Sequence, residues 1–158
     1  MFRIGMGYDS HRFQAGRPLV LGGVRVEHDA GLAGHSDADA VLHAVTDAVL
    51  GAIAAGDIGT LFPDTDPQWA GADSSQFLAE AVRRASEQGC RVANCDVTVL
   101  AEQPRLGPYK QEMAARVAEL LGVAVGAVAI KAKTNEQMGA IGRGEGIAVL
   151  AAVLLTEG

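Results

Sequence analysis

The sequence predicts an α+β fold, a single-domain sandwich in which helices cover one face of one mixed β-sheet. Segments rich in Val, Ile and Thr alternate with amphipathic helical segments, and the chain opens with a pattern typical of a β-hairpin. The length of 158 residues suits one domain. No repeat, low-complexity tail or shift in composition divides the chain, so we expect one domain over residues 1–158.

The N-terminal third is predicted to be β-rich. Short apolar and aromatic residues recur through residues 2–13, and Gly22-Gly23 is suited to a tight turn between Leu19–Leu21 and Val24–Val26.

A helix is predicted over residues 37–55, where apolar side chains recur at helical spacing. Ser36 or Asp37 is placed to cap this helix, and Gly56 is placed to end it. Residues 57–73 show no periodicity, and an irregular connection of this length in a small domain is usually functional or mobile, so we expect a lid here.

The rest of the chain is predicted to add two helices and three strands. In order, these are a helix capped by Asp73 or Ser74 and running to Gln88, a strand Cys90–Ala101, a helix from Pro108 to Leu121, and strands Val128–Thr134 and Ile147–Leu155, with a glycine-rich turn over Gly139–Gly146 between the last two.

The charge balance restricts the possible partners. Thirteen basic and nineteen acidic residues give a net charge of −6, which argues against a sequence-independent grip on nucleic acid or on an anionic membrane. The longest apolar stretches, Leu120–Ile130 and Ile147–Leu155, are shorter than the roughly 20 residues that span a bilayer. We expect no secretory leader and reduced thiols at Cys90 and Cys95, as in a cytoplasmic protein. Because the chain is acidic overall, any phosphate ligand is expected to be held locally, by metal ions, backbone amides or a few cations.

Three side chains are candidates for one metal site. Asp9 and His11 lie two residues apart, so on a strand they point to the same face, and His43 on the predicted helix can supply a third ligand. Two imidazoles and a carboxylate leave a position open, as in catalytic zinc sites. Asp39 and Asp47 are spaced to orient His43, although a solvated acidic face and a histidine satisfied within the core explain the same spacing.

The segment Gly34-His35-Ser36-Asp37 precedes the first predicted helix, where a helix terminus attracts phosphate oxygens. Ordinary capping is the alternative, and it explains Ser36 or Asp37 but not His35.

A second phosphate-binding candidate follows the strand that contains Lys131. Thr134 can hydrogen-bond a phosphate, and Glu136 is a hard oxygen ligand suited to Mg²⁺. The segment lacks the order of a P-loop, and a glycine-rich hairpin is an equally good interpretation.

Taken together, these segments resemble the 2-C-methyl-D-erythritol 2,4-cyclodiphosphate synthase family over nearly the whole chain. The motifs that carry the resemblance are Gly7-Tyr8-Asp9-Ser10-His11, Leu21-Gly22-Gly23-Val24, His35-Ser36-Asp37-Ala38-Asp39, Leu42-His43-Ala44, Gly56-Asp57-Ile58-Gly59, Phe62-Pro63-Asp64-Thr65-Asp66, Gly71-Ala72-Asp73-Ser74 and Gly142-Arg143-Gly144-Glu145-Gly146.

The resemblance implies a homotrimer with active sites at the subunit interfaces. It implies a cyclising phosphorus–oxygen lyase that converts 4-diphosphocytidyl-2-C-methyl-D-erythritol 2-phosphate to the 2,4-cyclodiphosphate and CMP, in non-mevalonate isoprenoid precursor biosynthesis. One Zn²⁺ per subunit is expected at Asp9, His11 and His43, and Mg²⁺ or Mn²⁺ is expected at Glu136 together with the substrate. Thr134 is implied as a further catalytic residue.

The same resemblance implies the substrate contacts. The diphosphate and methylerythritol are expected near His35, Ser36, Asp57, Gly59, Phe62, Asp64 and Asp66. The cytidine and its phosphates are expected near Ala101, Pro104, Arg105, Leu106, Ala132, Lys133 and Thr134, although Arg105 stands where the family commonly has lysine and Lys133 where it commonly has threonine. Arg143 and Glu145 resemble residues near a central channel that is proposed to take isoprenoid diphosphates.

Three alternatives remain beside this reaction, and the phosphate-binding features and the short chain do not favour the second of them. A zinc-dependent phosphohydrolase uses the same ligands to activate water, and a non-haem iron oxygenase also uses two histidines and a carboxylate. An isoprenoid-diphosphate-binding trimer acting as a sensor is the non-enzymatic alternative.

Overall fold

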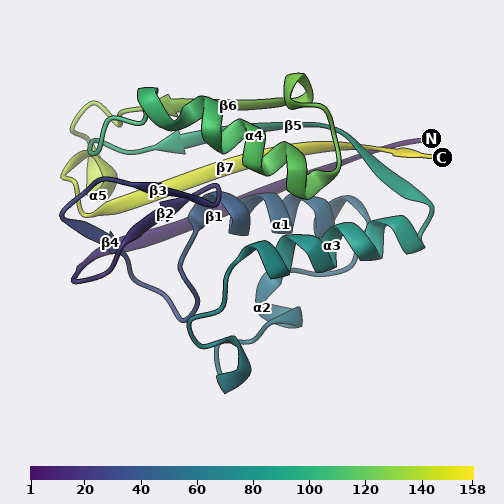
Figure 1. The fold of residues 1–158 in the computed structure, drawn as a ribbon, viewed down its shortest axis with the longest axis horizontal. Helices are drawn as coiled ribbons and strands as arrows, with labels where there is room; N and C mark the ends of the chain where they lie inside the picture. The colour runs from purple at the N-terminus through teal and green to yellow at the C-terminus, as the bar shows by residue number, and fades with distance from the viewer.

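A five-stranded sheet runs through the computed structural model, which describes residues 1–158 (Figure 1). The strand order is β4-β1-β7-β5-β6. β5 and β6 are parallel and the other neighbours are antiparallel, so the predicted mixed sheet is confirmed. The strands are β1 (Phe2–Ala15), β4 (Ala30–Leu32), β5 (Cys90–Leu100), β6 (Val128–Lys133) and β7 (Gly146–Glu157).

The predicted hairpin is present beside this sheet. β2 (Leu19–Leu21) and β3 (Val24–Val26) pair antiparallel around Gly22 and Gly23. Both glycines have positive φ, 61° and 72°, which glycine adopts without steric cost. The alternate residues of the two strands are buried, so the hairpin contributes one apolar face to the core.

Three long helices pack on one face of the sheet, as predicted (Figure 1). α1 lies on β1 and β7, α3 lies against α1 and β5, and α4 lies on β6. None of the helices combines the length and hydrophobicity that crossing a membrane requires. The helices are α1 (Ala40–Ala52), α2 (Ile58–Leu61), α3 (Ser75–Glu87), α4 (Lys110–Leu121) and α5 (Gly139–Gly142), with 3₁₀ turns η1 (Pro67–Trp69), η2 (Gly107–Tyr109) and η3 (Val125–Ala127).

The first helix is shorter at both ends than predicted. The residue that caps α1 is Asp39, whose side chain accepts a hydrogen bond from the Leu42 amide. Ser36 and Asp37 are not caps, because they accept from the amides of residues 38 and 39, ahead of the helix. At the other end the helix stops at Ala52, before Ala54 turns to a positive φ of 53°, so Gly56 does not end it.

The other boundaries differ from the prediction by short segments. Ser74 precedes α3 but makes no capping bond, and Asp73 instead accepts from the Ser75 amide. Pro108 lies in the 3₁₀ turn η2 ahead of α4. The segment predicted as an irregular lid contains α2 and η1, and the glycine-rich turn contains α5. β5 and β6 each end one residue early, whereas β1 and β7 run further than predicted.

Two glycines allow the first helix to lie directly on the first strand. A Cβ atom on Gly5 would sit 1.8 Å from the Ala48 carbonyl oxygen, and one on Gly7 would sit 1.9 Å from that of Ala44. No side chain fits at such distances, so only glycine permits this contact. The close approach places His43, the neighbour of Ala44, beside Asp9 and His11 of the same strand.

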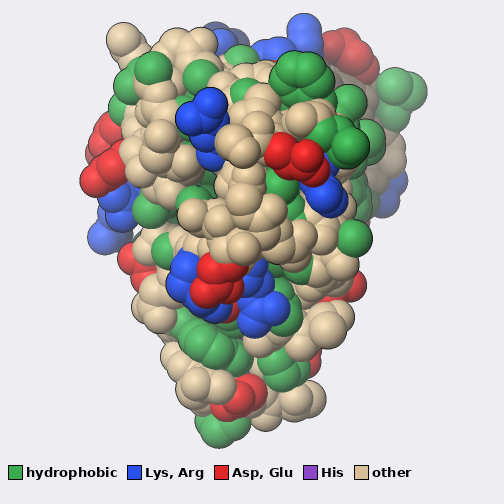
Figure 2. Space-filling view, turned by 90° about the vertical axis from the view of Figure 1, so that its right-hand side faces the viewer, with side chains coloured by type: hydrophobic (Ala, Val, Ile, Leu, Met, Phe, Trp, Pro, Cys, Tyr) green, Lys and Arg blue, Asp and Glu red, His purple; other side chains and the backbone are tan.

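The two chain termini lie together at one end of the molecule (Figure 1). Acidic and basic side chains adjoin one another on this end (Figure 2). One such ion pair joins Arg3 to Glu157 at 3.1 Å and so links the first strand to the last. Within the core, Cys90 and Cys95 are buried and unpaired.

Candidate functional site

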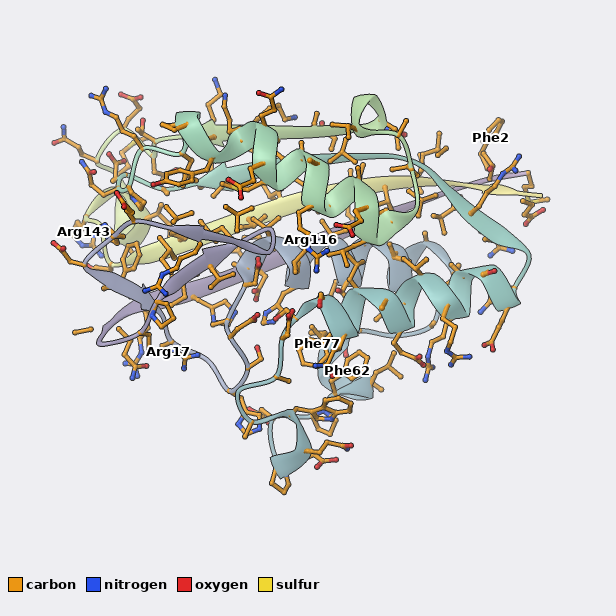
Figure 3. The ribbon with its side chains drawn as sticks, in the orientation of Figure 1. Phe2, Arg17, Phe62, Phe77, Arg116 and Arg143 are labelled. Atoms are coloured by element: carbon orange, nitrogen blue, oxygen red, sulfur yellow. The ribbon has the colours of Figure 1, made fainter.

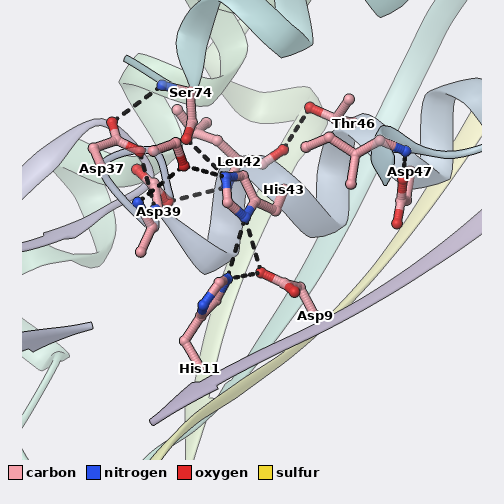
Figure 4. A network of polar contacts seen from close by, with 12 residues as sticks. Asp9, His11, Asp37, Asp39, Leu42, His43, Thr46, Asp47 and Ser74 are labelled. Atoms are coloured by element: carbon pink, nitrogen blue, oxygen red, sulfur yellow. Dashed lines mark hydrogen bonds and ion pairs between the residues drawn. The ribbon is translucent and has the colours of Figure 1, made fainter. Parts of the chain in front are cut away.

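Asp9, His11 and His43 converge on one point between β1 and α1 (Figure 4). Asp9 Oδ2 lies 2.8 Å from His11 Nε2 and 3.1 Å from His43 Nδ1. The two ring nitrogens are 3.3 Å apart. Ligand atoms bound to one tetrahedral zinc ion are about 3.3 Å apart, so these three atoms fit around one ion after small outward shifts. The donor set of two imidazoles and a carboxylate is also one that zinc favours.

The main chain fixes which nitrogen of His11 faces this point. His11 Nδ1 donates a hydrogen bond to the Ala33 carbonyl oxygen at 2.6 Å. The proton of the neutral ring is therefore on Nδ1, and the lone pair on Nε2 is directed toward Asp9 and His43.

His43 is held by hydroxyl groups and not by either carboxylate that its spacing suggested. Its Nε2 lies 2.8 Å from Ser74 Oγ and 3.2 Å from Ser36 Oγ. Asp39 instead accepts bonds from the amides of Gly22, Gly23 and Leu42, and Asp47 accepts from the amide of Ile58. Ser74 is contributed by a segment 31 residues away along the chain, and no local pattern in the sequence indicates it.

The pKa values of Asp9 and His11 are both shifted at this site. Burial raises the pKa of Asp9, but hydrogen bonds from His11 and His43 and their charges outweigh it and lower that pKa to about 2. Burial lowers the pKa of His11, but the hydrogen bond to Asp9 and its charge outweigh it and leave that pKa raised. Without a metal, the site therefore favours a carboxylate paired with an imidazolium, and a metal ion has to displace that proton.

A cavity of about 400 Å³ opens over the triad. Five of the predicted substrate residues line it, namely His35, Ser36, Gly59, Phe62 and Asp64. Asp57 and Asp66 are not among the lining residues. Their carboxylates cap α2 and η1 by accepting from the amides of Thr60 and Gln68.

An aromatic wall closes one side of this cavity and was not predicted. Phe62 and Phe77 lie next to each other below α1 and α3 (Figure 3), with ring centroids 4.6 Å apart. Trp69 meets them edge-on at 5.2 Å and 5.6 Å. In the sequence, Phe77 has the spacing of an ordinary core residue of α3, so its helical period conceals its place beside the site.

A second cavity, of about 530 Å³, lies where β5 and β6 end. Its lining includes every residue predicted for the cytidine end, Ala101, Pro104, Arg105, Leu106, Ala132, Lys133 and Thr134. Lys110 joins Arg105 and Lys133 in this lining and adds a third positive charge. The cavity therefore combines small apolar surfaces with cations suited to phosphate.

Glu136 lies on a tight loop beside this second cavity. Glu136 and Gln137 both have positive φ, 50° and 61°, a conformation that is uncommon for residues other than glycine. One carboxylate oxygen of Glu102 accepts from the amides of Asn135 and Gln137 and holds the loop. Thr134 Oγ1 donates to Glu136 at 2.9 Å, so the exposed Glu136 carboxylate adjoins the cavity lining.

Arg143 lies apart from both cavities. Its side chain is exposed and donates to Glu145 at 2.6 Å (Figure 3 labels Arg143).

Within one chain, packed core separates the triad from the second cavity. Asp9 pairs across the sheet with Val149, Val149 with Val99, and Val99 with Ala132. These three strand spacings amount to about 14 Å. Val149 and Val99 are completely buried, so no open path crosses this face of the sheet between the two cavities.

An α+β fold with two imidazoles and a carboxylate beneath a cavity defines a class of single-domain proteins with a candidate metal site. Comparison with known proteins identifies the family within this class. The chain belongs to the YgbB family, whose profile matches residues 2–156.

Relatives of known name cover almost the whole chain. The 2-C-methyl-D-erythritol 2,4-cyclodiphosphate synthase of Symbiobacterium thermophilum is 57% identical over 152 residues, covering 96% of this chain and 97% of that protein. The bifunctional enzyme IspD/IspF of Erythrobacter litoralis is 55% identical over 155 residues, and here the match spans 98% of this chain but only 40% of that longer protein. A solved structure of 2C-methyl-D-erythritol-2,4-cyclodiphosphate synthase in a CDP-bound form matches with a TM-score of 0.90 and 38% identity, covering 98% of this chain and all of that one, 100%.

Proposed function

We propose that the chain converts 4-diphosphocytidyl-2-C-methyl-D-erythritol 2-phosphate to 2-C-methyl-D-erythritol 2,4-cyclodiphosphate and CMP. It acts as a cyclising phosphorus–oxygen lyase in non-mevalonate isoprenoid biosynthesis, in the cytoplasm and as one domain over residues 1–158. The observation that carries the proposal is the convergence of Asp9, His11 and His43 beneath a cavity, in a chain 57% identical to a synthase of that name.

The bond changes are those of one intramolecular displacement. An oxygen of the 2-phosphate forms a bond to the β-phosphorus, and the bond from that phosphorus to the oxygen bridging the α-phosphate breaks. CMP leaves with the bridging oxygen and its electron pair. The nucleophile is already an anion, so no side chain has to act as a general base, and positioning and charge neutralisation carry the rate.

The residues present suit two cations. Zn²⁺ is assigned to Asp9, His11 and His43, and Mg²⁺ or Mn²⁺ to Glu136 together with substrate oxygens. When bound, these ions supply Lewis-acid polarisation of the β-phosphate and neutralise charge on the α- and β-phosphates.

The remaining groups hold the substrate. Ser36 and His35 face the cavity over the triad and are placed to donate to diphosphate oxygens. Phe62 and Asp64 line the same cavity for the methylerythritol end, and Asp57, Gly59 and Asp66 shape it through α2 and η1.

At the second cavity, Thr134 and Lys133 meet the phosphates, while the lining Ala101, Pro104, Arg105, Leu106 and Ala132 surrounds the cytidine. Arg143 is assigned to the mouth of a central channel, away from both cavities.

A homotrimer with interfacial sites accounts for two features of the single chain. Phe2, Ile4, Met6 and Tyr8 lie on the sheet face opposite the helices and are 58–75% exposed. Exposed apolar surface of this extent typically marks an interface. The packed core between the two cavities supports a substrate position between the triad of one subunit and the second cavity of its neighbour.

Zinc content measured alongside CMP release tests the proposal. We expect the wild-type protein to hold zinc and to form a cyclic product. His43→Ala loses zinc and turnover together, whereas Glu136→Ala keeps zinc and loses turnover by at least about 100-fold. An active, zinc-free His43 variant contradicts the metal assignment. A free monophosphate product in place of the cyclic one favours a phosphohydrolase instead.

A further inference from the structure

We propose that Ser74 and Asp37 form a positioning pair that fixes the tautomer of His43 and strengthens its binding as a metal ligand. This inference rests on the proposed function, because it assigns these residues a role toward the metal at the triad. Neither side chain lines the cavity over the triad, and Ser74 is completely buried.

The hydrogen bonds around Ser74 run in only one direction. The Ser74 hydroxyl and the Asp37 carboxylate oxygen Oδ1 are in very close contact, and the Ser74 amide donates to Oδ2 of the same carboxylate at 3.1 Å (Figure 4). A carboxylate only accepts, so the single hydroxyl proton of Ser74 is donated to Asp37. Ser74 Oγ can then only accept from His43, 2.8 Å away.

This direction determines the state of the His43 ring. Its Nε2 has to carry the proton that Ser74 Oγ accepts, which leaves the lone pair on Nδ1. Nδ1 is the nitrogen that faces Asp9 Oδ2 at 3.1 Å and His11 Nε2 at 3.3 Å. The charge of Asp37 also polarises the Ser74 hydroxyl, which makes its oxygen a better acceptor and Nδ1 a stronger ligand.

Ser36 is not an equivalent partner. Its Oγ lies farther from Nε2, at 3.2 Å, and accepts from the Ala38 amide. Its hydroxyl proton is not donated to a carboxylate, so it remains available to a ligand in the cavity that Ser36 lines. The two serines therefore have different roles: Ser74 positions the imidazole of His43, and Ser36 faces the substrate.

The backbone makes Ser74→Ala a clean variant. The segments on either side of the pair are joined by main-chain bonds, from the Asp37 amide to the Ala72 carbonyl at 3.0 Å and from the Gly71 amide to the His35 carbonyl at 2.8 Å. These bonds do not use the Ser74 hydroxyl, so its removal leaves the two segments paired.

The test compares four proteins, the wild type and three variants. Chelator competition measures zinc affinity, and the visible absorption spectrum of the cobalt-substituted protein reports the geometry of the ligands. Relative to wild type, Ser74→Ala should bind zinc about 10–100-fold more weakly and show an altered cobalt spectrum, because partners of metal-ligating histidines contribute on this scale. Asp37→Asn, which keeps an acceptor but removes the charge, should show a smaller loss. Ser36→Ala, the matched hydroxyl deletion, should stay within about threefold of wild type.

Circular dichroism and thermal melting of the metal-free chains check that each variant is folded. Wild-type zinc affinity and spectrum in folded Ser74→Ala overturn the positioning role while leaving the proposed function intact. Equal losses in Ser74→Ala and Ser36→Ala also overturn it. Absence of zinc binding in the wild-type protein overturns the proposed function and this inference with it. If Ser74→Ala does not fold, the intermediate affinity of Asp37→Asn decides the question, and a wild-type value there overturns the pair.

Discussion

The metal triad and the cavity at the ends of β5 and β6 differ in the secondary structure that positions their side chains. The triad side chains project from a long strand and a long helix that touch backbone to backbone through Gly5 and Gly7. The second cavity is lined mainly by residues of the loops that follow β5 and β6, with exposed cations such as Arg105 and Lys133. The core of one chain therefore fixes the first region, whereas the second is an open, positively charged surface of the loops.

The largest effect should come from filling the contact that holds the triad together. In Gly7→Ala the new methyl group would lie 1.9 Å from the Ala44 carbonyl oxygen, so α1 has to move away from β1 and take His43 with it. We expect a loss of about 3 kcal/mol in unfolding free energy, at the upper end for overpacking, and a fall in turnover of at least about 100-fold. Urea denaturation, zinc content and CMP release measure these effects.

Gly126→Ala is the matched control, because a methyl group there meets no atom within 4 Å. It should behave as wild type in all three measurements. If Gly7→Ala also retains zinc and activity, the idea that close helix–strand packing positions the triad is wrong.

The same contrast explains which parts of the site the sequence predicts. Asp9 and His11 are predictable because strand periodicity alone puts them on one face, and the residues of the second cavity follow from the family resemblance. Ser74 was missed because its partner is set by how two distant loops meet. The role of Gly7 was missed because a glycine in a strand does not show what approaches it. Asp39 was one of two candidates to orient His43 because its spacing fits an orienting carboxylate, but its oxygens accept from the β2–β3 turn and from the start of α1.

The fold class was easier to predict from the sequence than the ends of the helices and strands. The alternation of β-rich and amphipathic segments survives any local adjustment, so the mixed sheet and its helices were predicted correctly. The start of α1 depends on which of Ser36, Asp37 and Asp39 reaches a free helix amide, and the sequence does not distinguish three such residues within four positions.

Mixing two inactive variants tests whether the two regions belong to different subunits of one active site. Asp9→Ala removes the triad and Glu136→Ala removes the carboxylate beside the second cavity. In a trimer with two chains of one kind and one of the other, one of the three interfaces unites an intact triad with an intact second cavity. Purified mixed trimers should therefore regain about a third of wild-type activity.

Co-expression with two different affinity tags isolates the mixed assemblies, and each variant purified alone serves as the inactive reference. Persistent inactivity of mixed trimers that bind zinc would mean that both halves of the site come from the same chain. In that case the buried row of Val149 and Val99 does not separate them functionally.

The smallest expected effect is the pH dependence of the unfolding free energy that the triad gives the metal-free protein. The pKa of Asp9 is lowered to about 2, so its contribution to folding stability is present above an unfolded-state pKa of about 4 and is lost as the pH falls toward 2. The pKa of His11 is raised, so its contribution is complete below an unfolded-state value of about 6.5 and is lost as the pH rises through the raised value. Between about pH 4 and 6.5, both contributions stabilise the metal-free fold.

Asp9→Asn removes both contributions, so chelator-treated wild type should exceed it in unfolding free energy by roughly 1–2 kcal/mol at pH 5, with a smaller difference at pH 8.5. Urea denaturation at fixed protein concentration measures this difference. Zinc should reverse the trend in the wild-type protein, because it binds the deprotonated ring of His11 and gains affinity as the pH rises. The exposed Lys133 of the second cavity makes no ion pair, so Lys133→Ala serves as a control that should match wild type in stability at both pH values. A difference between wild type and Asp9→Asn that stays constant from pH 5 to pH 8.5 would show that the triad is not pre-assembled as an ion pair before the metal arrives.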